Sequence, residues 1–176
     1  MGAEAVSGDA KRAPAAALRP ALPGDVPMLA AIAEAAILEL TGEDYDTDQQ
    51  EAWAAAASDE EALAARLKDQ LTLVATRDGE VMGFIALADN KLIDMLYVRP
   101  EAVGEGVASL LYDAIERLAG ARGAKSLTVD ASDTALDFFS TRGFAPKQRN
   151  TLSLGGVWLA NTTMEKLLGP PEGSVH

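Results

Sequence analysis

The stretch VRPEAVGEGVASLLYDAIERL, residues 98–118, contains two glycines between a proline and a run in which apolar residues recur every three or four positions. This recurrence predicts an amphipathic helix that begins near residue 107. The apolar segment before Pro100 predicts a strand. A glycine loop between a strand and a helix directs unpaired backbone N–H groups and the positive end of the helix dipole at one place. We therefore expect this loop to bind a phosphate or pyrophosphate group.

Two familiar glycine loops do not fit these residues. A P-loop requires Lys and then Ser or Thr after its last glycine, whereas Val107 and Ala108 follow Gly106. A dinucleotide-binding loop requires a third glycine where this chain has Ser109. A pair of glycines before a helix also occurs where a loop packs closely on a strand. The pair alone leaves both interpretations open.

The segments around this stretch predict a sheet. LTLVAT (71–76) and EVMGFIAL (80–87) flank the tight-turn pair Asp78-Gly79, and KLIDMLYV (91–98) follows a second turn, so three antiparallel strands in series are expected. After the helix, KSLTVD (125–130) predicts a buried strand and TALDFFSTR (134–142) a short helix that ends at Gly143. Two more strands are expected around Gly155-Gly156.

The first part of the chain predicts one strand and three helices. LRPAL (18–22) predicts the strand, and Asp25 is expected to cap a helix with one apolar face. Two further helices are expected from capping boxes, Thr47 with Gln50 and Ser58 with Glu61. The order predicts an α+β fold, in which helices cover both faces of a mixed, mostly antiparallel sheet. We expect one domain over residues 18–168, a disordered segment at 1–17 and a flexible tail at 169–176.

Composition excludes several kinds of chemistry. The 176 residues include no cysteine, and the single histidine is His176, so thiol catalysis, zinc hydrolysis and a metal centre are not expected. A net charge of -12 argues against binding to nucleic acid. No segment is apolar enough for a membrane span or a signal peptide, so a cytoplasmic protein is expected. The acidic cluster GEDYDTD (42–48) either attracts a cationic substrate or only keeps the protein in solution.

Residues 93–144 resemble the core of the GNAT superfamily of N-acetyltransferases, whose signature is Q/R-x-x-G-x-G/A. The resemblance extends from LRPALPGDVPML at residue 18 to MEKLL at residue 168, and so covers nearly the whole expected domain. It is greatest to a subgroup of small bacterial members that carry DY, Q and AWA early and NTTMEK late. Those motifs are here Asp44-Tyr45, Gln49 or Gln50, residues 52–54 and residues 161–166.

The resemblance implies a GNAT-like fold, acetyl-CoA as the acetyl donor, backbone amides around its pyrophosphate, and strand backbone along its pantetheine arm. The residues implied at the cofactor are Leu96, Tyr97, Val98, Val103, Gly104, Glu105, Gly106, Val107, Ala108, Ser109 and Phe139. Two of them depart from the family pattern. Val103 replaces the Gln or Arg that opens the signature, and Phe139 stands where many members carry a tyrosine that protonates the departing thiolate.

Acetylation of an amine requires that the amine lose a proton, and Asp94 is the carboxylate that we favour for this role. It alternates with Leu92, Leu96 and Val98 along one strand, where a carboxylate is costly without a partner or a task. A structural ion pair would also explain it. Ser132 is a candidate for a contact with the cofactor or the acceptor, although capping the next helix is its commoner role.

Four residues are weaker candidates for the acceptor site. Glu39, Asp44 and Tyr45 follow the first helix, where they either bind an amine or form a solvated acidic loop. Trp53 either covers the acceptor pocket or anchors the second helix in the core. The expected function is direct transfer of acetyl from acetyl-CoA to a primary amine of a small molecule or peptide. A non-catalytic acyl-CoA-binding module and a purely structural domain are the alternatives, and a homodimer remains open.

Overall fold

The structure is a computed structural model that describes residues 16–169 and contains seven strands in one sheet. Its elements in chain order are β1 (Ala17–Pro20), η1 (Pro23–Asp25), α2 (Val26–Leu40), α3 (Thr47–Ala57), α4 (Glu60–Leu67), β2 (Leu71–Arg77), β3 (Glu80–Ala88), β4 (Leu92–Val98), η2 (Pro100–Ala102), α5 (Val107–Ala121), β5 (Ser126–Ser132), α6 (Leu136–Ser140), β6 (Ala145–Leu154) and β7 (Val157–Leu167). No helix among these residues is long and apolar enough to span a membrane.

The sheet is mixed and mostly antiparallel, with the strand order β1-β2-β3-β4-β5-β7-β6. Every neighbouring pair runs antiparallel except β4 and β5, which are parallel. Two-residue turns join β2 to β3 and β6 to β7, and Asp78 and Gly79 in the first of them both have positive φ, as the sequence predicted. The predicted α+β fold is confirmed.

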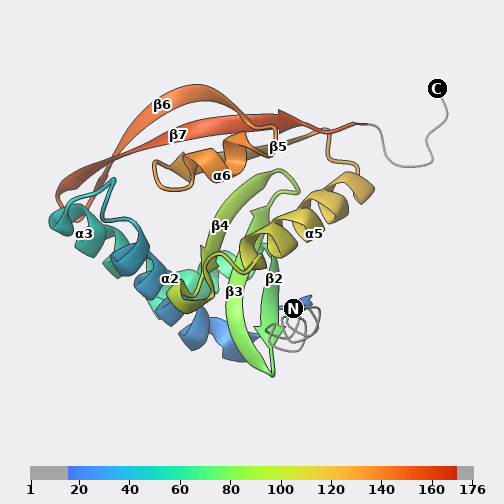
Figure 1. Ribbon diagram of the computed structural model, residues 1–176, viewed down its shortest axis with the longest axis horizontal. Coiled ribbons are helices and arrows are strands. Elements are labelled where there is room, and N and C mark those ends of the chain that lie inside the picture. Colours follow the sequence, from blue (N-terminus) through green and yellow to red (C-terminus); the bar gives the residue numbers. More distant parts are fainter. Residues whose placement is uncertain (1–15, 170–176) are drawn as a thin grey trace, which may run out of the picture.

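Helices cover both faces of the sheet, as Figure 1 shows with α2 on one side and α5 on the other. One apolar core contains Ile85, Leu111 and Ile115, and it packs α5 against the sheet. A second core contains Leu29, Phe84 and Met95, and it packs α2 against the opposite face. Phe84 and Ile85 are neighbours on β3 and enter different cores, because successive side chains of a strand point to opposite faces. Strand β4 likewise contributes to both cores, with Ile93 in the first and Met95 in the second.

The sheet opens between β4 and β5. The parallel ladder has only two residue pairs, Leu92 with Thr128 and Ile93 with Val129, and beyond them the strands separate. The register between β3 and β4 shifts at the same point, where Ile93 and Met95 pair with consecutive residues of β3 and Asp94 pairs with none. Asp94 is therefore the extra residue of a β-bulge, which bends and twists its strand. Figure 1 shows the result as two arms, with β2 to β4 in one and β5 to β7 in the other.

Three local predictions need correction. The cap of α3 is Asp46, which forms a capping box with Gln49, and the cap of α4 is Asp59, so both caps differ by one residue from the prediction. Asp25 makes no side-chain hydrogen bond that caps α2, because its carboxylate is bound by Arg19 at 2.8 Å and by the N–H of Leu22 at 2.7 Å. The predicted disordered segment at 1–17 and tail at 169–176 lie outside the described residues, except for residues 16, 17 and 169, and β1 begins at Ala17.

Candidate active site

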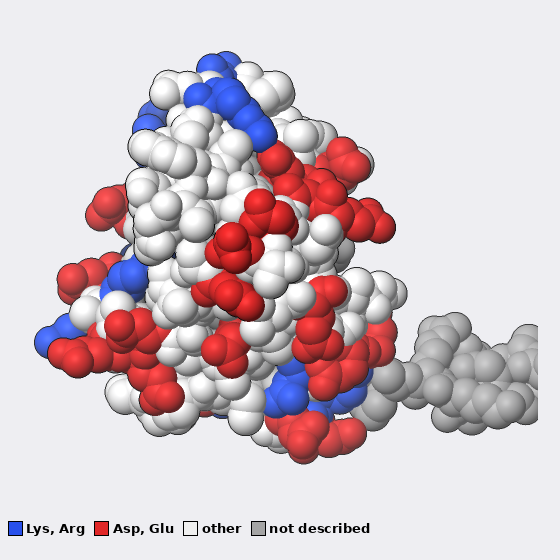
Figure 2. Space-filling model, turned by 90° about the vertical axis from the view of Figure 1, so that its left-hand side faces the viewer, with Lys and Arg blue, Asp and Glu red and all other residues white. Residues whose placement is uncertain are grey.

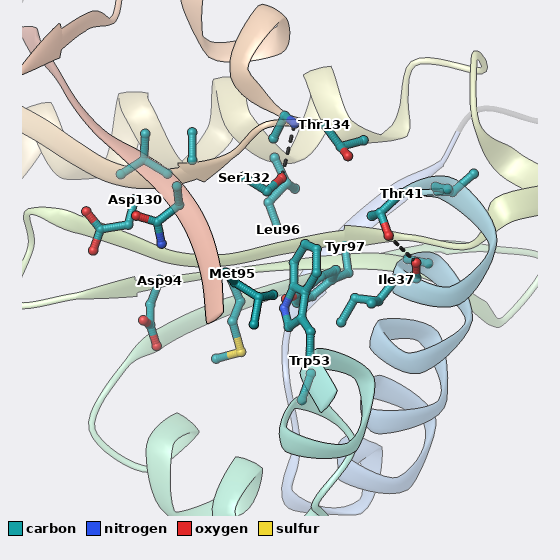
Figure 3. A pocket seen from close by; sticks show the side chains of 18 of the residues that line it. Ile37, Thr41, Trp53, Asp94, Met95, Leu96, Tyr97, Asp130, Ser132 and Thr134 are labelled. Carbon is teal, nitrogen blue, oxygen red and sulfur yellow. Dashed lines mark hydrogen bonds between the residues drawn. The ribbon is translucent and has the colours of Figure 1, made fainter. Parts of the chain in front are cut away.

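A cavity of about 610 Å3 occupies the opening between β4 and β5. Figure 3 shows side chains from β4, β5, α2 and α3 around it. Most of its lining is apolar, and the polar side chains in the lining, apart from the tyrosine and tryptophan rings, are Thr41, Arg66, Asp94, Asp130, Ser132, Thr134 and Asn161. A concave apolar chamber with a few convergent polar groups is the usual form of a small-molecule site.

The glycine loop leads into α5, whose residue Ala108 belongs to the lining of this cavity. Gly104 and Gly106 have φ values of +85° and +86°, a conformation that side chains other than glycine rarely adopt. A Cβ atom at either position would meet nothing within 4 Å, so close packing of the loop does not explain these glycines. Gly106 is the residue that precedes α5, and the N–H groups of the first helical turn have no partner within the helix. The positive φ values of these two glycines thus shape the loop that leads into α5.

Not every residue of the loop can offer its amide to a ligand. The N–H of Val103 donates to Pro100 and that of Glu105 donates to Ala102, so these two amides are already used within the loop. Those of Gly106, Val107 and Ala108 make no hydrogen bond of this kind. The Val103 side chain is 54% exposed. Because their amides are unpaired among the described residues, Gly106 and the first residues of α5 are the favoured donors to an anion.

Two arginine side chains contact the loop and the first turn of α5. Arg77 at the end of β2 forms a 2.5 Å ion pair with the Glu105 carboxylate. Arg142, which follows α6, donates to the Ser109 hydroxyl, and its guanidinium lies 3.6 Å from the centre of the Phe138 ring. Neither arginine was singled out in the sequence, because each is close to the loop only in the folded chain.

The end of β4 forms one wall of the cavity with Leu96, Tyr97 and Val98. Trp53 of α3 donates a hydrogen bond from its indole nitrogen to the Tyr97 hydroxyl at 3.2 Å, so it lies at the cavity as well as packing α3. Burial raises the pKa of Tyr97, more than the Trp53 hydrogen bond lowers it. Phe139 faces the same cavity and is 2% exposed, within a cluster that includes Tyr112 and Phe144. It can contribute shape and apolar surface but no proton.

Asp94 lies on the cavity wall in an ion pair. Its Oδ2 atom accepts hydrogen bonds from Arg66 of α4 at 2.6 Å and from Gln70 at 2.8 Å. The sequence predicted Asp94 on the same face as Leu96 and Val98, which is wrong. Leu96 and Val98 pack with the α5 core, while the bulge turns Asp94 toward α4 on the opposite face. Its Oδ1 atom makes no hydrogen bond to the described residues.

Ser132 does not take the capping role considered for it, because the residue that caps α6 is Ala135 and no side chain forms a capping hydrogen bond there, but Ser132 lines the cavity. Its Oγ atom accepts a hydrogen bond from the N–H of Ala135 at 3.1 Å, in the turn that leads into α6. Because that bond uses an oxygen lone pair, the proton of the hydroxyl is still available to a ligand.

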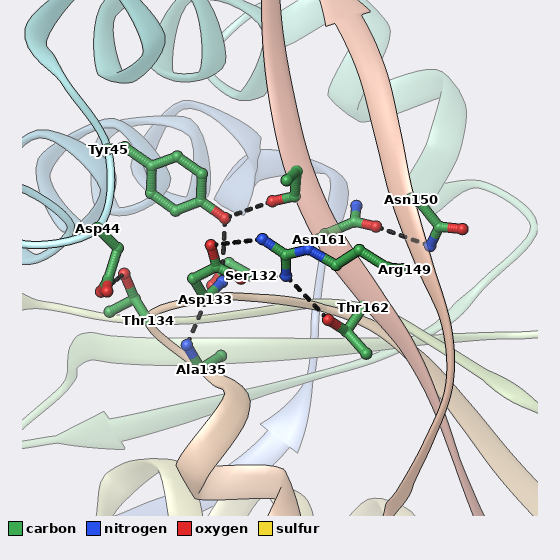
Figure 4. Close-up of polar contacts among 11 residues, drawn as sticks. Asp44, Tyr45, Ser132, Asp133, Thr134, Ala135, Arg149, Asn150, Asn161 and Thr162 are labelled. Atoms are coloured by element: carbon green, nitrogen blue, oxygen red, sulfur yellow. Dashed lines mark hydrogen bonds and ion pairs between the residues drawn. The ribbon is translucent and has the colours of Figure 1, made fainter.

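Of the four weaker acceptor candidates, Tyr45 and Trp53 are brought together at the cavity, whereas Glu39 and Asp44 lie outside its lining. Glu39 is exposed and does not line the cavity. Asp44 is also outside the lining, but its carboxylate accepts a hydrogen bond from Thr134 at the rim at 2.8 Å. Tyr45 is 5% exposed and belongs to the wall, so the alternative of a solvated loop is wrong for this residue. Figure 4 shows its hydroxyl between β7 and the turn after β5.

Several lining residues were missed in the sequence. Asp130 follows the last bridge between β5 and β4, Asn161 lies opposite Ser132 on β7, and Leu152, Leu154 and Leu159 come from the β6–β7 hairpin. The segments that contain Asp130 and Asn161 were predicted as strands, and neither residue was assigned a functional role. Asp130 could have been identified as a candidate because it is an acidic residue at the end of a predicted buried strand.

Comparison with known proteins agrees with this geometry. Residues 41–168 match the family model described as an acetyltransferase (GNAT) domain. The chain is 34% identical over 142 residues to the uncharacterized N-acetyltransferase YafP of Escherichia coli K12, a match that covers 81% of this chain and 89% of YafP. A GCN5-related N-acetyltransferase from Rhodopseudomonas palustris has 57% identity and a TM-score of 0.85, with 89% of this chain and 98% of that one covered.

Similar solved structures also contain the cofactor. The PaiA N-acetyltransferase of Thermoplasma acidophilum, in complex with coenzyme A, has a TM-score of 0.73 at 20% identity, covering 88% of this chain and 100% of that one. Other GNAT structures with the same fold hold acetyl-CoA. The open sheet, the glycine loop and these matches lead to one conclusion: the chain belongs to the GNAT superfamily and is an N-acetyltransferase.

Proposed function

We propose that the enzyme transfers acetyl from acetyl-CoA to a primary amine by direct attack of the amine on the thioester. The observation that carries this proposal is the cavity itself, whose lining includes Ala108 in the first turn of α5, the end of β4, and Asp94 with Asp130. A single chamber of this kind can bring the two substrates together, and orientation of reacting groups supplies several kcal/mol of the barrier.

The cofactor would be held mainly by backbone. The amides of Gly106, Val107 and Ala108 at the start of α5 suit the pyrophosphate, since they combine unpaired N–H groups with the helix dipole. Beyond Ile93 the edge of β4 has no partner in β5, so backbone groups at Leu96 to Val98 can bind the amide groups of the pantetheine arm. Backbone binding also explains how an acidic protein can hold an anionic cofactor without a basic surface.

Asp94 would accept the proton that the attacking amine loses. Arg66 and Gln70 fix the carboxylate through Oδ2, which leaves Oδ1 for the amine or for a water between them. Ser132 has a hydroxyl proton available on the same cavity wall. Phe139 cannot protonate the sulfur, so the thiolate would leave as an anion, because a thiol with a pKa of about 8.5 is a fair leaving group near neutral pH. The sequence has no cysteine that could carry the acetyl group in between.

The test combines binding with turnover. Calorimetry with acetyl-CoA should show one site, and release of free thiol should depend on an added primary amine. In Asp94→Asn, kcat should fall about 10²- to 10⁴-fold, the range typical of general-base catalysis, while acetyl-CoA affinity stays unchanged. Binding without amine-dependent thiol release across a broad amine panel would overturn the proposal, and unaltered kinetics in Asp94→Asn would remove this residue from it.

A further inference from the structure

Asp94 and Asp130 occupy equivalent places at the opening of the sheet. The last bridged pair of the parallel ladder is Ile93 with Val129, and these two aspartates are the next residue on each strand. Figure 3 shows both at the same end of the cavity, away from Thr41 and Trp53. The fold therefore places two carboxylates where its two arms diverge.

The two carboxylates differ in whether a positively charged side chain is bound to them. Asp94 is paired with Arg66 at 2.6 Å. Asp130 is exposed, and the hydrogen bond it accepts comes from the neutral Thr163 hydroxyl at 2.6 Å. Within residues 16–169 no Lys or Arg forms an ion pair with Asp130. One end of the cavity thus carries a negative charge that attracts a cation. Acidic side chains are also widespread on the face of the molecule in Figure 2, where Lys and Arg are few.

Among residues 16–169, the rest of the lining offers a substrate no further charged side chain without a partner. Arg66 is the one basic residue of the lining, and Asp94 already binds it. Asp94 and Asp130 are the acidic residues of the lining, and both are at the same end. The remaining walls are mainly apolar, with Trp53 from α3 and Leu152 and Leu159 from β6 and β7. Such walls suit a hydrocarbon or an aromatic ring, and they do not suit an anionic group or a second ammonium.

We propose that the acceptor is a hydrophobic primary amine, with its ammonium group bound by Asp130 and its apolar body between Trp53 and the leucines of the β6–β7 hairpin. This inference rests on the proposed function and adds the substrate class and a binding residue. Asp130 attracts and orients the ammonium, and the proton then passes to the open oxygen of Asp94. The amine nitrogen forms its bond to the acetyl carbon, the bond from that carbon to sulfur breaks, the sulfur leaves with the electron pair, and the nitrogen gives its second proton to water.

The first experiment uses the unmodified enzyme and a series of amines at saturating acetyl-CoA. Along butylamine, pentylamine and hexylamine, kcat/KM should rise about fourfold for each added methylene, the factor expected for burial of one CH2 group. Phenethylamine should be a better acceptor than spermidine, glutamate or an alanine-initiated peptide. A flat alkylamine series, or a preference for any of those three polar acceptors, would overturn the inference while leaving N-acetyl transfer intact.

The second experiment tests Asp130. In Asp130→Asn, KM for hexylamine should rise about 10- to 100-fold, as expected for loss of a charge-assisted hydrogen bond, while acetyl-CoA affinity measured by calorimetry is unchanged. Asp137→Asn on α6, an exposed carboxylate outside the cavity lining, is the matched control and should leave KM unchanged. An unchanged KM in Asp130→Asn would contradict the assignment of this residue. If no amine releases thiol from enzyme that binds acetyl-CoA, the proposed function itself fails and the acceptor class fails with it.

Discussion

The Tyr45 hydroxyl donates a 2.7 Å hydrogen bond to the backbone carbonyl oxygen of Ala160, which lies on β7, 115 residues further along the chain. The same hydroxyl accepts a hydrogen bond from the N–H of Asp133 at 3.0 Å. Its ring also contacts Trp53 edge-on, with 5.4 Å between the ring centres. Tyr45 therefore ties the segment after α2 to the β5–β7 arm across the cavity (Figure 4).

The change Tyr45→Phe should destabilise the fold. It removes the hydroxyl and with it two hydrogen bonds to part-buried backbone groups, each of which contributes about 0.5–1.5 kcal/mol. We expect the free energy of unfolding in urea to fall by about 1–3 kcal/mol. Tyr112→Phe is the matched control, because the buried Tyr112 hydroxyl has no hydrogen-bond partner among the described residues. Equal losses in the two variants would show that the Tyr45 hydrogen bonds contribute nothing.

The parts of the fold that sequence could predict are those determined by neighbouring residues. Apolar spacing and turn residues such as Gly79 and Gly143 act locally, and they located the strands, the long helices and the glycine loop. The bulge at Asp94 was not predictable, because it depends on the register between β3 and β4. Neither was the burial of Tyr45, whose partners are distant in sequence. The acidic residues around Tyr45 favoured a solvent-exposed loop, but contacts with distant residues bury this side chain.

The positive φ at Gly106 makes a clear prediction for the loop. A side chain in this left-handed conformation is strained by about 1 kcal/mol or more, so Gly106→Ala should lower the melting temperature and weaken acetyl-CoA binding by distorting the start of α5. Gly120→Ala is the control within the same helix, since a Cβ there meets nothing within 4 Å and the backbone is helical. It should stabilise the protein by about 0.5–1 kcal/mol. Unchanged acetyl-CoA affinity in Gly106→Ala, measured by calorimetry, would argue against the loop as the cofactor site.

Gly83 allows β3 to approach β4 beside the cavity. A Cβ atom at this position would lie 2.8 Å from the backbone oxygen of Tyr97 and 3.2 Å from the Cα atom of Val98. Gly83→Ala must therefore push the two strands apart, and overpacking of this kind costs about 1–3 kcal/mol. We expect a lower melting temperature together with weaker acetyl-CoA binding, since Tyr97 and Val98 line the cavity. Gly24→Ala, where a Cβ has no neighbour within 4 Å, should leave cofactor affinity unchanged. A stable Gly83→Ala variant with normal affinity would contradict the expected coupling.

The ion pair between Asp133 and Arg149 should make stability depend on pH in the acidic range. The hydrogen bond from the Arg149 guanidinium lowers the pKa of Asp133, and the smaller effect of burial opposes it. Because the pKa of Asp133 is lower in the folded chain than in the unfolded chain, the unfolded chain binds more protons in acid. The ion pair thus contributes its full stability above the unfolded pKa of about 3.9, and the contribution disappears as the pH falls through the folded value.

In urea titrations, Asp133→Asn should have a lower midpoint than the unmodified protein at pH 7, and the difference should shrink as the pH is lowered below about 4. Arg149→Gln should reproduce this effect, and adding Asp133→Asn to it should change little more, since the two changes remove the same interaction. A difference in midpoint that stays constant from neutral pH into acid would exclude the Asp133 carboxylate as its source.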